Sequence, residues 1–119
     1  MTGKAKRKGD SAEREAAELL TELLGSTCRR QLGAGRSDDV GDIDGVADCV
    51  VQVCDWKDKS AACLQKPVGA EQQRLNAGVE HAVTMIRFRG GKWRMVMTPE
   101  QWSCLYVRAN EPDSARSPL

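Results

Sequence analysis

The segment 49–56 constrains the fold more than any other part of the chain. It reads Cys-Val-Val-Gln-Val-Cys-Asp-Trp, so apolar and β-branched side chains stand at most of its positions. β-branched residues favour strands, and a strand with so little alternation of polar and apolar residues is buried on both faces. We therefore expect residues 49–56 to form a central strand in a sheet that helices flank.

Local patterns predict the elements around this strand. Apolar residues at helical spacing indicate a first helix that Asp10 caps, with Glu13 at the third helical position. The pair Gly90-Gly91 predicts a tight hairpin turn, and Thr98 before a proline predicts the start of a last helix. In chain order we expect a helix over 10–24, strands over 27–32, 42–46 and 49–56, a helix from Pro67 to about Gly78, strands over 82–88 and 92–97, and a helix from Thr98 to about 107.

This order of elements is typical of an α/β fold with a single mixed β-sheet of about five strands flanked by helices. A chain of 119 residues has room for one domain. We expect a basic N-terminal arm over 1–9, the domain over 10–109 and a disordered, polar tail over 110–119. We recognise no run that approaches the ~20 apolar residues of a membrane span. We also recognise no secretory signal, so we expect a cytoplasmic protein without a membrane partner.

The five cysteines are odd in number and never form a C-x-x-C pair. This pattern argues against a disulfide framework and against a standard zinc site, so we expect mostly buried thiols. His81 is the single histidine, and we assign it no catalytic role. Trp56, Trp93 and Trp102 are expected in the core or at its rim.

The charges are distributed unevenly, although the net charge is only +1. Separated basic clusters around an acidic centre suit a polyanion held by its phosphates, with metal ions among the carboxylates. Ordinary solvated faces explain the same charges equally well. The basic clusters are Lys4, Lys6, Arg7 and Lys8; Arg29, Arg30 and Arg36; and Arg87, Arg89, Lys92 and Arg94. The acidic residues between them are Asp38, Asp39, Asp42, Asp44 and Asp48.

Several carboxylates are placed so that they could share a site. Glu13 lies beside the apolar stripe of the first helix, so it can face the sheet. Asp42 and Asp44 share one face of their strand by alternation, as do Asp55 and Lys57 if the next strand extends that far. Carboxylates that hold a divalent metal, next to a lysine, supply what phosphodiester hydrolysis needs.

Three short motifs stand in a fixed order along the first half of the chain. They are Lys8-Gly9 with Glu13-Arg14 after three intervening residues, Arg29-Arg30 before a Gly/Ser-rich loop, and Gly41-Asp42-Ile43. In this order the chain resembles the PD-(D/E)xK nuclease superfamily, and within it the Holliday junction resolvases of archaeal and phage type. The resemblance covers roughly residues 8–106 and implies a restriction-endonuclease-like core.

The resemblance implies a homodimeric, Mg²⁺-dependent endodeoxyribonuclease, with Mn²⁺ as a substitute. Its substrate would be branched DNA such as a Holliday junction, in recombination and repair, and its place the host cytoplasm if a phage encodes it. The metal would be held by Glu13, Asp42 and Asp55 with a contribution from Gln52, and Lys57 would assist the attacking water. DNA phosphates would be held by Lys6, Arg7, Lys8, Arg14, Arg29, Arg30 and Arg36.

One strand motif leaves alternatives open. Ten residues after Asp42, where related phage sequences carry the acidic residue of E-x-K, this chain has Gln52, with Cys54 in the lysine position. Asp55-Trp56-Lys57 spells D-x-K three residues later. Either the catalytic pair is Asp55 and Lys57, or Gln52 is a weak ligand and Lys57 acts from a shifted position.

Other functions and simpler structural roles also remain open at this stage. The fold could bind DNA without cleaving it, or could act as a restriction-like or repair nuclease on another substrate. Glu13 could be a capping-box glutamate, Asp42 and Asp44 turn residues, and 55–59 a solvated strand end.

Overall fold

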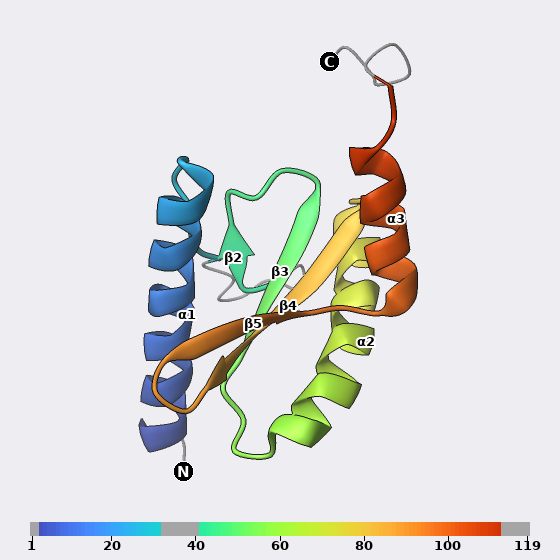
Figure 1. Cartoon of the computed structure of the whole chain (residues 1–119). Coiled ribbons are helices and arrows are strands. Elements are labelled where there is room, and N and C mark those ends of the chain that lie inside the picture. Colours follow the sequence, from blue (N-terminus) through green and yellow to red (C-terminus); the bar gives the residue numbers. More distant parts are fainter. Residues whose placement is uncertain (1–2, 32–40, 113–119) are drawn as a thin grey trace.

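The computed structural model describes residues 3–31 and 41–112, with the helices and strands in the order that the sequence predicts (Figure 1). None of the described helices combines the length and the apolar composition that a membrane span needs. The elements are α1 (Gly3–Leu24), β1 (Arg29–Arg30), β2 (Ile43–Asp44), β3 (Cys49–Cys54), α2 (Lys59–Ala77), β4 (His81–Phe88), β5 (Lys92–Val96) and α3 (Pro99–Ala109).

The described strands form one mixed sheet in the order β1-β2-β3-β4-β5. β3 and β4 are parallel, whereas the other neighbours are antiparallel. Parallel strands need a crossover connection, which α2 supplies. The fold is therefore α/β with a single mixed five-stranded sheet, as predicted, and β3 is its central strand.

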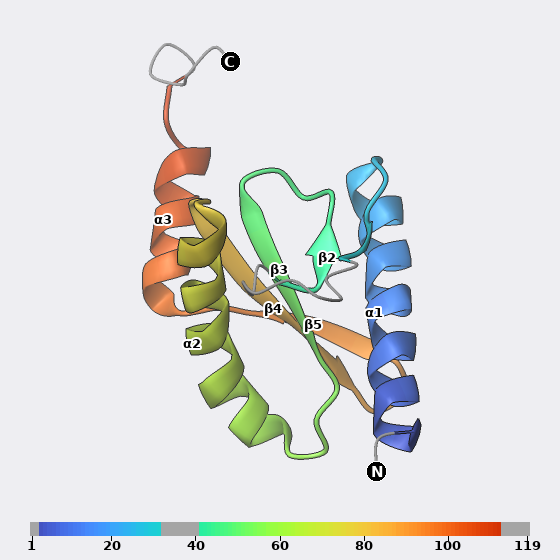
Figure 2. The same ribbon diagram turned by 180° about the vertical axis from the view of Figure 1, so that it is seen from behind.

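Alternate residues of β3 contact different helices. Val51 packs with Ala16 and Leu20 of α1, whereas Val50 packs with Ala70 of α2. Both faces of the strand are thus covered, which explains why its apolar residues do not alternate with polar ones. Figures 1 and 2 show α1 and α2 on either side of the strands, with α3 beside the start of β4.

The first helix starts earlier than predicted. α1 begins at Gly3, so the prediction that Asp10 caps it is wrong. Lysine, arginine and alanine fill residues 4–8 and are strong helix formers, so the helix continues through the segment expected as a separate arm. Glu13 consequently lies in the middle of α1, where it cannot act as a capping-box glutamate, and Asp10 instead forms an ion pair with Arg30.

The second helix also starts earlier than predicted. α2 begins at Lys59, because the Asp58 side chain accepts a hydrogen bond from the main-chain N–H of Ala61 (2.9 Å) and caps the helix. Pro67 therefore lies inside the helix, although it removes a main-chain donor there. The predicted end is confirmed, since Gly78 has the left-handed conformation (φ 71°) that commonly ends helices.

The remaining boundaries agree with the sequence more closely. Gly90 and Gly91 both have positive φ (79° and 71°), as the predicted tight turn between β4 and β5 requires. Thr98 caps α3 by accepting from the main-chain N–H of Gln101. β1 and β2 are shorter than expected, with two residues each. The predicted disordered tail lies mostly in 113–119, outside the described residues.

The cysteines are free thiols. Cys28 and Cys54 are buried, as expected, and the other three are partly buried. Trp93 is half-buried, whereas 39% of Trp56 and 56% of Trp102 remain exposed. Trp93 therefore packs against the core as expected, whereas Trp56 and Trp102 are exposed, contrary to the expectation.

Candidate active site

Asp42 lies just before β2, where the main chain turns sharply. Gly41 has a φ of 101°, and a Cβ atom there would lie 2.8 Å from Cγ1 of Val50, so only glycine fits. The Asp42 main-chain N–H donates to the Val51 carbonyl (2.9 Å), and its Oδ2 accepts from the main-chain N–H of Val53 (2.8 Å). The side chain of Asp42 therefore continues the hydrogen bonding of β3 beyond the end of β2.

Glu13 of α1 is electrostatically coupled to Asp42. Burial, and next the negative charge of Asp42, raise the pKa of the Glu13 carboxyl above its ordinary value of 4.5, while the Arg30 guanidinium opposes the shift. Arg30 Nε lies 3.2 Å from Glu13 Oε1, and its Nη2 lies 2.8 Å from Asp10 Oδ1. A partly buried carboxyl group that feels a second negative charge is favoured in its charged form by a nearby cation.

Asp55 follows the end of β3 and is held by two cations. Its side chain is only 12% exposed and lies 3.1 Å from Lys59 Nζ and 3.3 Å from Arg87 Nη1. Arg87 Nη2 is also paired with Glu15 of α1 (3.1 Å), and Glu15 accepts a hydrogen bond from Trp93 Nε1 (2.8 Å). These contacts join the ends of β3, β4 and β5 to α1.

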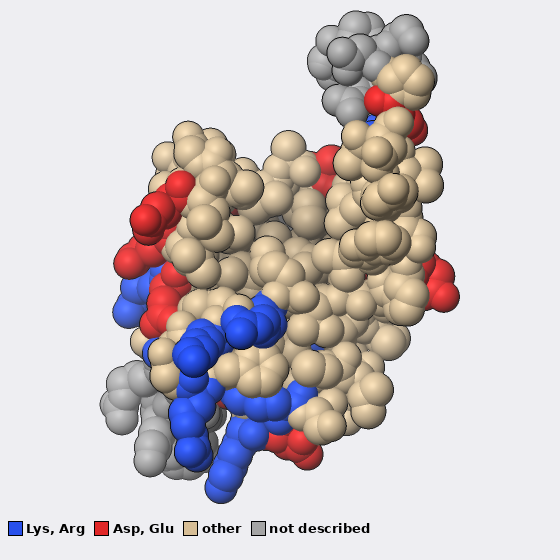
Figure 3. Space-filling view, in the orientation of Figure 1, with Lys and Arg blue, Asp and Glu red and all other residues tan. Residues whose placement is uncertain are grey.

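Asp55 lines an open pocket of about 370 Å³. Lys57 and Arg89, both exposed, lie on the same pocket. Lys92 and Arg94, exposed on β5, extend the basic surface across the hairpin. Figure 3 shows blue side chains gathered over this lower part of the molecule. A carboxylate thus lies at the edge of a basic surface that a polyanion can contact.

Asp42 and Asp55 are linked through the end of β3. Asp42 binds the main chain of Val53, and Asp55 follows two residues later, just beyond the end of the strand. Within the described part of the chain, the carboxylate oxygens of Glu13, Asp42 and Asp55 do not all lie within 4.8 Å of one another. Mg²⁺ prefers oxygen ligands, so the three carboxylates suit it chemically. Because Mg²⁺ also keeps several bound waters, it does not need direct contact with all three carboxylates.

Gln52 lies on the other face of the sheet. It is 7% exposed and its Oε1 accepts from Thr84 Oγ1 (3.2 Å), and a Cβ atom at Gly69 of α2 would lie 3.6 Å from its Nε2. Cys54 is buried on the same face with Ala62 of α2. Strand alternation therefore separates residues 52 and 54 from Val53, which faces α1. The structure does not bring Gln52 together with Glu13 and Asp42.

The other predicted residues are distributed as follows. Asp44 is exposed and lines a different pocket, with Gly45 and Asn76 among its neighbours. Arg14 and Arg29 are exposed beside an apolar pocket of about 320 Å³ between α1 and β1. Arg36 lies outside the described residues, as do the side chains of Lys6, Arg7 and Lys8.

The sequence alone does not single out Glu15, Lys59 or the link between Arg87 and Asp55. The local pattern groups Arg87 with the charges of the hairpin and does not pair it with Asp55. The pairing follows from the parallel register of β3 and β4, in which Cys54 lies opposite Ile86. Extending that register by one residue would have placed Arg87 beside Asp55.

Comparisons with protein-family models, with curated proteins and with solved structures gave no significant match.

Proposed function

We propose that this chain is a metal-dependent endodeoxyribonuclease that acts on branched DNA such as a Holliday junction. The observation that carries this proposal is that Asp42, whose charge acts on Glu13, binds the main chain of Val53 two residues before Asp55, and that Asp55 lies at the edge of a basic surface. Hydrolysis of a phosphodiester requires two components. They are acidic side chains that can bind a divalent cation and basic side chains that can contact the phosphate.

The proposed roles follow from these positions. Glu13, Asp42 and Asp55 would hold Mg²⁺, with Mn²⁺ as a substitute; the bound ion supplies activation of water and neutralisation of phosphate charge. Arg30 keeps Glu13 oriented through its ion pair. Lys57, exposed on the same pocket as Asp55, would contact the phosphate that is cleaved.

The geometry favours Asp55 and Lys57 over Gln52 as the working strand motif. Asp55 and Lys57 line one pocket, whereas Gln52 is buried against α2 and hydrogen-bonded to Thr84. The proposal therefore gives Gln52 no part in metal binding and assigns it a packing role beneath α2.

DNA would be held through its phosphates rather than read by sequence. Exposed arginines lie on both sides of the acidic group, with Arg14 and Arg29 near α1 and Arg89 near the hairpin. Phosphate contacts position a duplex without carrying sequence information. Symmetric cleavage of a four-way junction needs two such sites, so the proposed active form is a homodimer.

One observation favours a second function, DNA binding without cleavage. Asp55 is already paired with Lys59 and Arg87, and both ion pairs must loosen before Asp55 can bind a metal. If both ion pairs of Asp55 persist when DNA binds, the basic surface would hold the DNA and no cleavage would follow.

A cleavage assay separates the two functions. Labelled four-way junction and linear duplex are incubated with Mg²⁺, with Mn²⁺ and with a chelator, using the wild type, Glu13→Gln and Glu22→Gln. Glu22 is exposed on the same helix, so Glu22→Gln is a matched control. We expect metal-dependent nicking of the junction that Glu13→Gln abolishes and Glu22→Gln retains. Metal-independent binding with no cleavage by the wild type would instead support the binding protein.

A further inference from the structure

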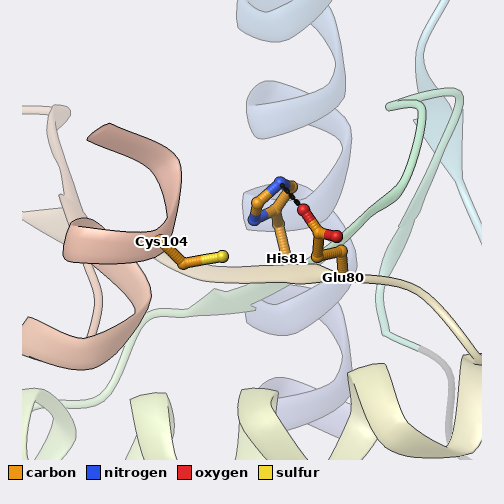
Figure 4. Close-up of side chains that lie close together, drawn as sticks. All are labelled: Glu80, His81 and Cys104. Atoms are coloured by element: carbon orange, nitrogen blue, oxygen red, sulfur yellow. Dashed lines mark ion pairs between the residues drawn. The ribbon is translucent and has the colours of Figure 1, made fainter. Parts of the chain in front are cut away.

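A second group of potential ligand atoms lies at the start of β4, away from the acidic site. In the described part of the chain, Glu80, His81 and Cys104 are the one set in which three such atoms all lie within 4.8 Å of one another. Glu80 directly precedes β4, His81 is the first residue of β4, and Cys104 belongs to α3. Figure 4 shows the Cys104 thiol extending from α3 towards His81 and Glu80.

The chemistry of these donors differs from that of the acidic site. An imidazole nitrogen, a thiolate sulfur and a carboxylate oxygen are the ligands that Zn²⁺ and similar ions take, whereas Mg²⁺ prefers oxygen alone. Tetrahedral Zn²⁺ with ligand distances of ~2.0–2.3 Å spaces its ligands by roughly 3.5 Å. The three donor atoms are therefore close to the spacing that such an ion requires.

His81 is held from its far side by a buried residue. Its side chain is 11% exposed, and its Nδ1 lies 2.8 Å from Nε2 of Gln101, which is buried. A metal-binding histidine usually has such a partner, which fixes the ring. With Nε2 on a metal, Nδ1 carries the proton, and the Gln101 amide turns over to accept it through Oε1.

Glu80 already lies against positive charge. Its Oε1 is itself shielded from solvent, although 41% of the side chain is exposed, and lies 3.2 Å from both His81 Nε2 and Arg108 Nε without a well-directed hydrogen bond. The Arg108 guanidinium therefore occupies the side of this carboxylate where a metal ion would bind. Arg108 is half exposed and also lies 3.8 Å from Glu111 Oε1, so it has a second partner when it leaves Glu80.

We propose that Glu80, His81 and Cys104 bind a thiophilic divalent ion of the Zn²⁺ class, which fastens α3 to the sheet. Three protein ligands leave one position for water. The direct contact between α3 and His81 runs through Gln101, so the ion adds a second connection across the same junction. This site is independent of the proposed nuclease activity.

The other thiols make the proposal specific to Cys104. Cys28 and Cys54 are buried, and burial, with the charges of Asp48 and Glu71, raises the pKa of the Cys49 thiol to about 11. Cys49 is therefore protonated at neutral pH, where it is a poor ligand. Cys63, partly buried like Cys104 but outside the cluster, is the matched control.

The test uses the full chain with Co²⁺ as a spectroscopic probe and Zn²⁺ in calorimetry, under a thiol-free reductant. We expect one equivalent bound, a thiolate-to-cobalt absorption band, and a melting temperature that rises with Zn²⁺. Cys104→Ser should lose the band, and both Cys104→Ser and His81→Gln should bind at least roughly tenfold more weakly. Cys63→Ser and Glu22→Gln should show the band and the Zn²⁺ affinity of the wild type.

Three results would overturn the proposal. They are a wild type without the thiolate band, a folded Cys104→Ser protein that binds Zn²⁺ as tightly as the wild type, and loss of the band in Cys63→Ser. Circular dichroism establishes that each variant is folded. If Cys104→Ser does not fold, His81→Gln and the wild-type band still decide the outcome.

Discussion

Oδ2 of Asp42 accepts a hydrogen bond from the main-chain N–H of Val53 at 2.8 Å. The contact joins the residue before β2 to the central strand, and it leaves Asp42 beside Glu13, whose pKa it raises. Asp42 therefore has a structural role through one interaction and a proposed chemical role through its charge. Substitutions that keep one and remove the other can separate these roles.

Asp42→Asn should abolish cleavage while leaving stability near that of the wild type. The amide oxygen can still accept from Val53, but the charge that would hold a metal is lost. Asp42→Ala should abolish cleavage and also destabilise the fold by about 1–3 kcal/mol, because the Val53 N–H loses its partner. Urea unfolding beside the cleavage assay checks both variants, and an active Asp42→Asn enzyme would remove Asp42 from the proposed site.

Glu13→Gln should be at least as stable as the wild type at neutral pH. The folded-state pKa of Glu13 is raised above 4.5, so the stability that the neutral carboxyl contributes is fully present below pH 4.5. It is lost as pH rises through the raised pKa. Glutamine stays neutral throughout, so the stability of the variant relative to the wild type should increase over this window. Unfolding curves from pH 4 to pH 7 test this. A Glu13→Gln protein whose free energy of unfolding falls relative to the wild type as pH rises would contradict the raised pKa.

The element order was predictable because each signal is local. The β-branched residues of 49–56 mark the central strand, Gly90-Gly91 marks a hairpin turn, and Thr98 marks the start of a helix; each signal depends on few neighbouring residues. Helix starts were harder to predict. Aspartate commonly caps helices, so Asp10 looks like a helix start. The helix propensity of residues 4–8 outweighs this preference, and α1 begins at Gly3.

The arrangement of the candidate site was less predictable than the fold. Alternation shows that Gln52 and Asp55 cannot share a face of a regular strand, but it does not show which face α1 covers. The ion pair of Asp55 with Arg87 depends on the register between β3 and β4, which are joined through the whole of α2. No local pattern encodes that register.

Binding of branched DNA should depend strongly on salt and little on sequence. Arg29 is exposed beside the pocket between α1 and β1, and Arg89 is exposed on the pocket of Asp55, so each is expected to contact a phosphate. Replacing either by alanine should weaken binding and reduce the slope of log K against log salt by about 0.9. Arg74→Ala serves as control, since Arg74 is on α2 and paired with Glu71. Equal slopes for all these proteins would contradict the proposed interface.

Asp55 and Lys57 form the proposed strand motif. Lys57→Ala should abolish cleavage without loss of stability, because Lys57 is exposed. Asp55→Asn should abolish cleavage with a modest loss of stability, since its two ion pairs weaken. Both variants should still bind junction DNA in a gel-shift assay. Normal cleavage by Asp55→Asn would exclude Asp55 as a metal ligand.

Introducing the E-x-K pattern of the nucleases that the sequence resembles, through Gln52→Glu with Cys54→Lys, gives the complementary test. Both positions are buried beneath α2, so the double variant places two charges where water is excluded. Desolvation costs several kcal/mol per ion, and their mutual attraction only partly offsets it. We therefore expect a strongly destabilised protein with no gain in cleavage. A stable double variant with increased cleavage would show that the strand can turn residues 52 and 54 towards Glu13 and Asp42, and would assign the metal site to that register instead.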